Sequence, residues 1–250
     1  EKPPPLAPPK LDDDDAVGQL VGLGAVKEAP TAEQLRRAAG VGARAVAGSD
    51  KAVFLFPAET AEQLSAVAEG ASLGAYAFTE FKSAAGEDSK PLGEAVIATD
   101  LGPLKDVKAL LTRAAVVARH TKHARDLVNT PTEHMGPQQL EDPEVFAEHA
   151  ISSAKGLDIK VTVWDEKKLA SEDMGGILGV GRGSARPPRL VKVDYAPSRA
   201  KGHVALVGKG ITFDTGGISL KQPAGMEEMK SDMAGAAPVL PAALPAAAIQ

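Results

Sequence analysis

The sequence predicts an α/β protein made of two α/β domains joined by a long helix. Three observations support this prediction. Apolar segments of strand length alternate with helical patterns along the chain, and one helical pattern near the middle is much longer than the others. The 250 residues are also 44% hydrophobic and 24% charged, which is typical of a folded globular protein. A chain of this length is expected to form one or two domains.

The first α/β domain is predicted over residues 1–102, after a solvated arm at 1–15 that is rich in proline and aspartate. Helices are expected to begin at Thr31 and Thr60, because a glutamine follows each threonine by three residues, as in a capping box. Strands are expected from the apolar runs at 52–56 and 94–99. This alternation favours a layered structure with a largely parallel sheet.

A long linker helix is predicted over residues 103–130. Leucines and valines recur there at helical spacing, and Pro131 ends the pattern because the residue before a proline is pushed out of the helical region. The second domain is predicted over residues 131–250. It holds a helical pattern within 143–156, followed by apolar segments at 159–164, 175–180, 190–195 and 203–207.

The composition excludes several classes of site and partner. The chain has no cysteine, which rules out disulfides, thiolate zinc sites, iron–sulfur clusters and a cysteine nucleophile. The net charge of −5 gives no overall attraction to nucleic acid or to an anionic membrane, so neither is expected as a partner. The N-terminus lacks a signal-peptide pattern, and the longest uncharged run, 234–249, is too short to span a membrane. These features favour a cytoplasmic protein.

The histidines give little indication of a metal site. His120 and His123 are three residues apart on the predicted long helix, a spacing that could place both on one ion. Their basic neighbours would repel a cation, so surface positions are favoured instead. The remaining histidines are isolated in the sequence, at His134, His149 and His203.

Candidate chemistry is concentrated in residues 207–235. A strand ending at Val207 would deliver Lys209 at its carboxyl edge, where α/β folds place their ligands. Asp214 and Lys221 flank a glycine-rich turn, and a predicted helix then carries Asp232, with Glu228 one turn before it.

These residues allow three interpretations. A phosphate site is disfavoured, because the Walker spacing is absent and Asp214 would repel a phosphate. Carboxylates that converge with lysines suit a divalent cation better, with one lysine left to stabilise an oxyanion. Two ordinary lysine–aspartate ion pairs are the alternative.

The segments 208–221 (GKGITFDTGGISLK) and 225–233 (GMEEMKSDM) resemble the leucyl aminopeptidase (cytosol aminopeptidase) family in a long ungapped match. Residues 125–131 and 176–188 resemble further segments of that family. The resemblance implies an N-terminal α/β domain, a linker helix and a C-terminal catalytic domain. It also implies a homohexamer with two divalent metal ions per subunit, Zn²⁺ or Mn²⁺, and bicarbonate as a candidate further cofactor. The implied activity is release of leucine-like N-terminal residues from peptides by attack of a metal-activated water.

The resemblance also implies roles for individual residues. Lys209 would bind one metal, Asp214 would bridge both metals, and Asp232 would complete the first site. Lys221 would be the catalytic lysine that polarises the scissile carbonyl. Met226 would line the pocket for the N-terminal side chain, and Lys221 and Asp232 would also contact the substrate. A lysine binds a metal only as the neutral amine, so the site must remove its proton.

The sequence departs from the family pattern after Asp232. The family's Asn-Thr-Asp-Ala-Glu-Gly-Arg segment, which supplies two metal carboxylates and a bicarbonate-binding arginine, is not present. The 250 residues are therefore expected to be part of a longer enzyme and to be inactive alone. The alternative is a non-catalytic oligomeric or DNA-binding relative on the same scaffold. Three prolines also argue against a continued helix after Asp232, namely Pro238, Pro241 and Pro245.

Overall fold

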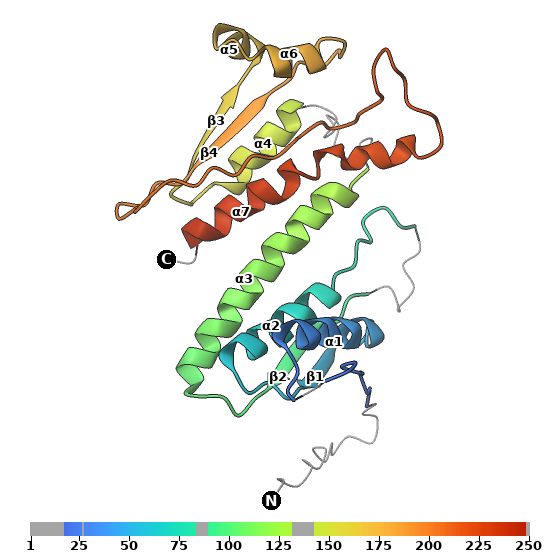
Figure 1. Ribbon diagram of the computed structural model, residues 1–250, viewed down its shortest axis with the longest axis vertical. Helices are drawn as coiled ribbons and strands as arrows, with labels where there is room; N and C mark the ends of the chain where they lie inside the picture. The colour runs from blue at the N-terminus through green and yellow to red at the C-terminus, as the bar shows by residue number, and fades with distance from the viewer. Residues whose placement is uncertain (1–17, 27, 84–89, 132–142, 249–250) are drawn as a thin grey trace, which may run out of the picture. The chain divides into compact units, whose positions relative to one another are not determined.

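The computed structural model describes residues 18–26, 28–83, 90–131 and 143–248 (Figure 1). The chain divides into two compact units, one formed by residues 1–75 and 86–99 and the other by residues 76–85 and 100–250. Both units combine helices with a pair of strands. The predicted mixed α/β character is therefore confirmed.

The first unit packs two helices against a two-stranded parallel sheet (Figure 1). Helix α1 (Ala32–Ala45) lies beside α2 (Ala61–Gly74), and strand β1 (Lys51–Leu55) pairs in parallel with β2 (Glu94–Ala98). The core of this unit is one buried cluster that includes Leu35, Phe54, Val67 and Leu92. Both predicted strands form within one residue of their expected bounds.

Both predicted capping boxes form. The Thr31 hydroxyl accepts a hydrogen bond from the Gln34 amide at 3.2 Å, and the Gln34 side chain accepts one from the Thr31 amide at 2.9 Å. Thr60 and Gln63 repeat this arrangement at the start of α2. The Gln63 side chain also donates to the carbonyl oxygen of Pro30 at 2.8 Å, which joins the beginnings of the two helices.

Glycines let α1 and α2 approach each other backbone to backbone. A Cβ atom on Gly70 would overlap the carbonyl group of Arg36, whose carbon would lie only 2.9 Å away. A Cβ atom on Gly42, which is also helical and buried, would have its nearest neighbours at 3.5 Å. Alanine substitutions at Gly70 and Gly42 can therefore distinguish the effect of close helix packing from the effect of helix propensity on stability.

We expect Gly70→Ala to lower the free energy of unfolding by about 1–3 kcal/mol, because the added methyl group must push the helices apart. We expect Gly42→Ala to be neutral or to stabilise by up to ~1 kcal/mol, because alanine is the better helix former. Urea denaturation of both variants measures the difference. Equal effects of the two substitutions would show that the helices are not in close contact at Gly70.

The second unit contains the remaining elements. They are α3 (Leu104–Asn129), α4 (Pro143–Ser153), β3 (Lys160–Trp164), α5 (Glu166–Ser171), α6 (Gly175–Gly181), β4 (Leu190–Asp194), the 3₁₀ helix η2 (Met226–Met233) and α7 (Ala236–Ala248). Strands β3 and β4 pair antiparallel, so the predicted parallel arrangement holds only in the first unit. A parallel pair needs a crossover that runs back along the sheet. Helices α5 and α6, which connect β3 to β4, lie at one end of the strand pair and do not run back along it (Figure 1).

Two apolar segments differ from the strand-like pattern in the sequence. Residues 175–180 lie within helix α6, and residues 203–207 form no strand ladder in the described part of the chain. Val204 and Val207 are 87% and 93% exposed. A strand needs a partner edge to satisfy its backbone groups, and the described residues place none beside this segment.

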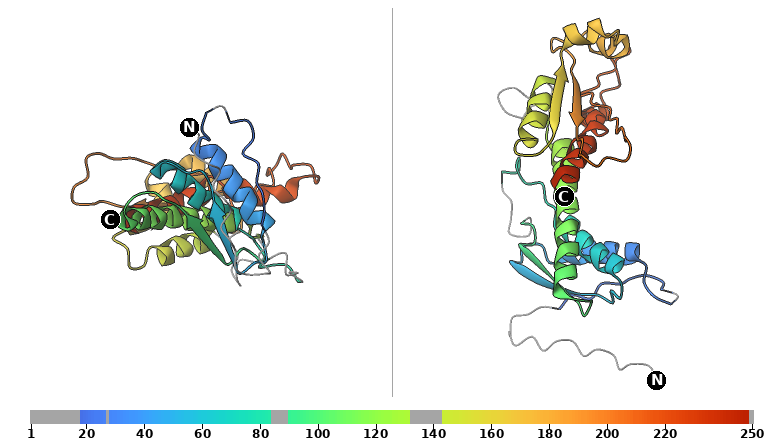
Figure 2. Two further views of the ribbon diagram at one scale, coloured as in Figure 1. Left: turned by 90° about the horizontal axis from the view of Figure 1, so that it is seen from below. Right: turned by 90° about the vertical axis from the view of Figure 1, so that its left-hand side faces the viewer.

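The expectation that prolines would stop the chain from continuing as a helix is wrong, because α7 runs through all three of them. Pro238 lies in the first turn, where a helix needs no amide donor. Pro241, Leu240 and Leu244 are buried, and α7 packs along α3 in both figures of the whole chain (Figures 1 and 2). This burial offsets the cost of interior prolines.

None of the helices within the described ranges is both long enough and apolar enough to cross a membrane.

Candidate metal centre

Two lysine–aspartate pairs involve all four side chains for which metal-binding or catalytic roles were predicted. Lys209 Nζ donates to Asp232 Oδ1 at 2.7 Å, and Lys221 Nζ donates to Asp214 Oδ2 at 2.8 Å. The charge on Lys209 also acts on the Asp214 carboxylate, which links the two pairs electrostatically. Residues from two chain segments, 209–221 and 226–233, thus converge in one place.

Glycine contacts fix the position of Lys209. A Cβ atom on Gly208 would lie 2.6 Å from Ala236 Cα, and one on Gly235 would lie 2.8 Å from the Lys209 amide nitrogen. The Ala236 amide donates to the Lys209 carbonyl oxygen at 2.8 Å. These glycines allow the segment that carries Lys209 to touch the segment that follows Asp232, and only glycine fits at such close approach.

A compact turn holds Asp214 beside Lys221. The Gly216 amide donates to Asp214 Oδ1 at 2.9 Å, and the Lys221 amide donates to the Thr215 carbonyl oxygen at 2.9 Å. Gly216 has a φ of +89°, which favours glycine. The hydrogen bond from the Lys221 ammonium holds the pKa of Asp214 below its usual value, and the hydrogen bond from the Gly216 amide lowers this pKa further. Asp214 is therefore ionised at neutral pH, the state in which a carboxylate binds a metal.

The helix that carries Asp232 is a 3₁₀ helix, although the sequence pattern predicts an α-helix. With three residues per turn, it aligns Met226, Met229 and Asp232 on one face. Met229 Sδ accepts a hydrogen bond from Lys221 Nζ at 2.8 Å. The sequence analysis identified Asp232 and Glu228 on this helix but missed the contact of Met229 with Lys221. The signal that could have revealed it is the i, i+3 spacing of these residues. Glu228 is exposed.

The donors fit part of the coordination shell of a divalent cation. Asp232 Oδ2 is buried and has no hydrogen-bond partner, although a buried carboxylate oxygen normally has one. Together with Lys209 and Asp214, it presents nitrogen and oxygen donors of the kind that Zn²⁺ and Mn²⁺ accept. Within the described ranges, no three His, Cys, Asp or Glu residues cluster as they would in a complete metal site. The described residues therefore offer part of the donor set that a divalent cation would need.

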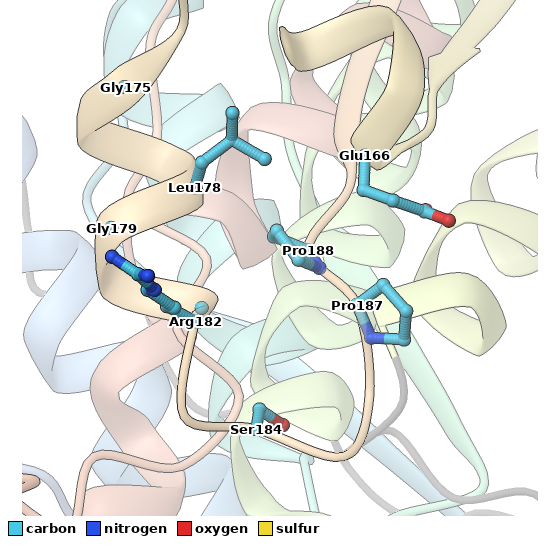
Figure 3. Close-up of a pocket in the computed structure, with 9 residues that line it drawn as sticks. Glu166, Gly175, Leu178, Gly179, Arg182, Ser184, Pro187 and Pro188 are labelled. Atoms are coloured by element: carbon cyan, nitrogen blue, oxygen red, sulfur yellow. The ribbon is translucent and has the colours of Figure 1, made fainter.

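An open hollow of about 530 Å³ lies elsewhere in the second unit (Figure 3). Its lining combines apolar side chains such as Leu178 and Pro188 with Arg182 and Ser184. Glu166, which also lines it, accepts a hydrogen bond from the Arg189 guanidinium at 2.8 Å. The hollow is lined by residues 166–188, whereas the predicted ligands lie at 209–232.

The structure corrects the interpretation of the histidines. Both ring nitrogens of His120 are buried, and His123 Nε2 lies 2.8 Å from His149 Nε2. His120 and His123 are therefore not simple surface residues, and His149 is not isolated. His203 is exposed, and His134 lies outside the described residues.

Comparison with known proteins identifies two family domains in the chain. Residues 122–250 match the model for the catalytic domain of the cytosol aminopeptidase family. Residues 19–85 match the model for the N-terminal domain of the same family. The sequence resemblance found in residues 208–233 is therefore confirmed.

Individual relatives agree with the family models. The chain is 48% identical over 236 residues to a probable cytosol aminopeptidase of Micrococcus luteus, covering 92% of this chain and 45% of that protein. It is 50% identical over 220 residues to the corresponding protein of Leifsonia xyli subsp. xyli, covering 87% and 42%. The chain thus spans less than half the length of these curated relatives.

Solved structures show the same partial match. The bottromycin maturation enzyme BotP in complex with Mn aligns with a TM-score of 0.72 and 35% identity, covering 90% of this chain and 47% of that one. The cytosol aminopeptidase from Coxiella burnetii aligns with a TM-score of 0.68 and 28% identity, covering 87% and 43%.

Proposed function

The chain belongs to the cytosol aminopeptidase family, and we propose that it is the first part of a metal-dependent aminopeptidase that releases leucine-like N-terminal residues from peptides. The observation that carries this proposal is the convergence of Lys209, Asp214, Lys221 and Asp232 within the segment that matches the family's catalytic domain. Because the chain spans less than half of its curated relatives and holds an incomplete ligand set, it is inactive alone.

Lys209, Asp214 and Asp232 hold two divalent metal ions, Zn²⁺ or Mn²⁺, together with carboxylates from the rest of the protein. The Mn complex of BotP supports a divalent metal in the family. Bound metals supply a Lewis acid and an activated water at neutral pH. Bicarbonate, as a further cofactor, would need an arginine from the family segment that the chain does not contain.

Lys221 acts on the substrate. Its ammonium group has three N–H donors, of which Asp214 and Met229 take two. The third is available to the carbonyl oxygen of the scissile bond, where negative charge develops in the transition state. Asp232 orients the free α-amine, and Met226, on the same face of η2, forms part of the wall for the N-terminal side chain.

We also propose the division into an N-terminal domain at 1–102, a linker helix at 103–130 and the first part of the catalytic domain at 131–250. The two family models, at 19–85 and 122–250, support the existence of both domains. Assembly into a cytoplasmic homohexamer is part of the same proposal, and family membership supports it.

Hydrolysis of leucyl p-nitroanilide by the complete protein tests the proposed function. We expect turnover that disappears with a chelator and returns with Mn²⁺ or Zn²⁺. N-acetyl-leucyl p-nitroanilide serves as the matched control substrate, because its α-amine is blocked, and it should not be cleaved. Turnover at the full rate after metal removal, or equal cleavage of the blocked substrate, would exclude a metal-dependent aminopeptidase.

A further inference from the structure

Two histidines from different helices face each other in the second unit. They precede the residues of the lysine–aspartate pairs in the sequence. His123 of α3 and His149 of α4 bring their Nε2 atoms to 2.8 Å, with ring centroids 5.0 Å apart and ring planes at 78°. The Ser153 hydroxyl, one turn further along α4, lies 3.5 Å from the same His149 nitrogen. His123 Nε2 and Ser153 Oγ therefore both lie near His149 Nε2.

Packing near the two rings holds α3 and α4 together. Leu127 and Val128 of α3 and Phe146 of α4 belong to one apolar cluster with Met233 and Ala237. Leu127 follows His123 by one turn, and Phe146 precedes His149 by three residues, so the cluster fixes both helices close to the rings. The distance between the two Nε2 atoms is thus set by the fold and not by free side chains alone.

Both rings are kept in the form that binds metals. Burial lowers the pKa of His123, with Asp126 acting in the opposite direction. Burial also lowers the pKa of His149, and the nearby His123 adds to this effect. A histidine whose pKa is lowered is neutral at pH 7, and a neutral imidazole is the commonest metal ligand in proteins.

The charged residues near His123 and His149 carry both signs. On α3, the basic residues Arg119, Lys122 and Arg125 are opposed by Asp126. On α4, Glu148 is the charged neighbour of His149. Helix α7, which packs against α3, carries no charged side chain. Lys230 of η2 donates a hydrogen bond to the Asn129 carbonyl oxygen. The cationic neighbours that argued against metal binding in the sequence are therefore partly balanced.

We propose that His123 and His149 form a second metal site, which bridges α3 and α4 and takes a divalent transition metal of the Cu²⁺, Ni²⁺ or Zn²⁺ class. Imidazole nitrogens suit these ions, and the Irving–Williams order places Cu²⁺ first among them. The Ser153 hydroxyl or water completes the coordination. Because the described residues bring no third His, Asp or Glu to the site, it binds more weakly than a four-ligand structural zinc site.

Binding requires only small changes. Without metal, one ring donates its Nε2 proton to the Nε2 lone pair of the other. With metal, that proton resides on Nδ1 of the same ring, so both Nε2 lone pairs face the ion and no proton is released. Metal–nitrogen distances of 2.0–2.1 Å in a tetrahedral site place the two nitrogens about 3.3 Å apart, slightly further than in the hydrogen-bonded pair.

A bound ion would tie the end of α3 to α4. The ion would stabilise the second unit because it binds only the folded state, in which the two histidines lie together. The site is independent of peptide hydrolysis, because neither histidine belongs to the proposed catalytic set.

The test uses the 250-residue chain and Cu²⁺ at neutral pH. Electron paramagnetic resonance should show a copper centre coupled to two imidazole nitrogens, and Cu²⁺ should raise the melting temperature. His123→Gln and His149→Gln, made on separate helices, should each lower the copper affinity at least tenfold and remove the two-nitrogen signal. His203→Gln, which changes an exposed histidine, is the matched control and should bind copper as the wild type does.

The result that would overturn the proposal is equally specific. A wild-type spectrum without two coupled imidazole nitrogens would show a hydrogen-bonded histidine pair that takes no metal. The same conclusion would follow if both histidine variants kept wild-type affinity, or if the His203→Gln control also lost the two-nitrogen signal. The wild-type spectrum decides the matter even if one of the variants does not fold.

Discussion

Lys221→Ala is expected to slow the hydrolysis of leucyl p-nitroanilide by roughly 10²–10³-fold in the complete protein, the usual effect of losing one donor to an oxyanion. Its bound metal content should not change. The reason is that Lys221 Nζ contacts Asp214 and Met229 and keeps one N–H for the substrate, whereas the proposed ligands are Lys209, Asp214 and Asp232. The variant therefore removes a catalytic donor without removing a ligand.

Steady-state kinetics and metal analysis of the same preparation measure the two effects separately. Lys201→Ala is the matched control, because Lys201 is an exposed lysine in the same unit, and it should leave both quantities unchanged. If Lys221→Ala lost metal in proportion to activity, Lys221 would be a ligand or a structural residue, and the role assigned to it would be wrong.

Local sequence signals predicted the first unit well. The capping boxes at Thr31 and Thr60 form as expected because they involve residues only three positions apart. The strands near 52–56 and 94–98 are short apolar runs that pair with each other in parallel. Each of these features depends on nearby residues or on an apolar pattern, and both can be recognised in the sequence alone.

Features that depend on tertiary packing were harder to predict. A short glycine-rich apolar run such as 175–180 can be a strand or a helix, and periodicity cannot separate the two. Residues 203–207 have the composition of a strand but lack a partner among the described residues. Helix α7 accommodates interior prolines because it is buried against α3, which no local rule indicates.

The candidate site shows the same contrast. Lys209, Asp214, Lys221 and Asp232 were identified from the sequence because they lie within 24 residues of one another. Their pairing, and the alignment of Met229 with Asp232, depend on the 3₁₀ geometry of η2 and on close glycine contacts. The His123–His149 pair joins residues that are 26 positions apart on two helices, so no local pattern indicates it.

Asp214→Asn is expected to cause the largest loss of function, because it removes a carboxylate that would hold the metal ions. The amide keeps the size of the side chain and can still accept the Gly216 hydrogen bond, so the turn should persist. The loss in metal affinity should exceed the roughly 10–100-fold that follows loss of a partner outside the coordination shell. Hydrolysis should fall with the metal content.

Elemental analysis of the complete protein after dialysis tests this central claim most directly. With Mn²⁺, an ion outside the class proposed for the histidine pair, the account predicts two ions per subunit in the wild type and fewer than one in Asp214→Asn. It predicts an unchanged content in Glu228→Gln, which changes an exposed carboxylate on η2. A wild-type metal content in Asp214→Asn would contradict it, because the Lys221–Asp214 contact would then be an ordinary ion pair and not part of a metal centre.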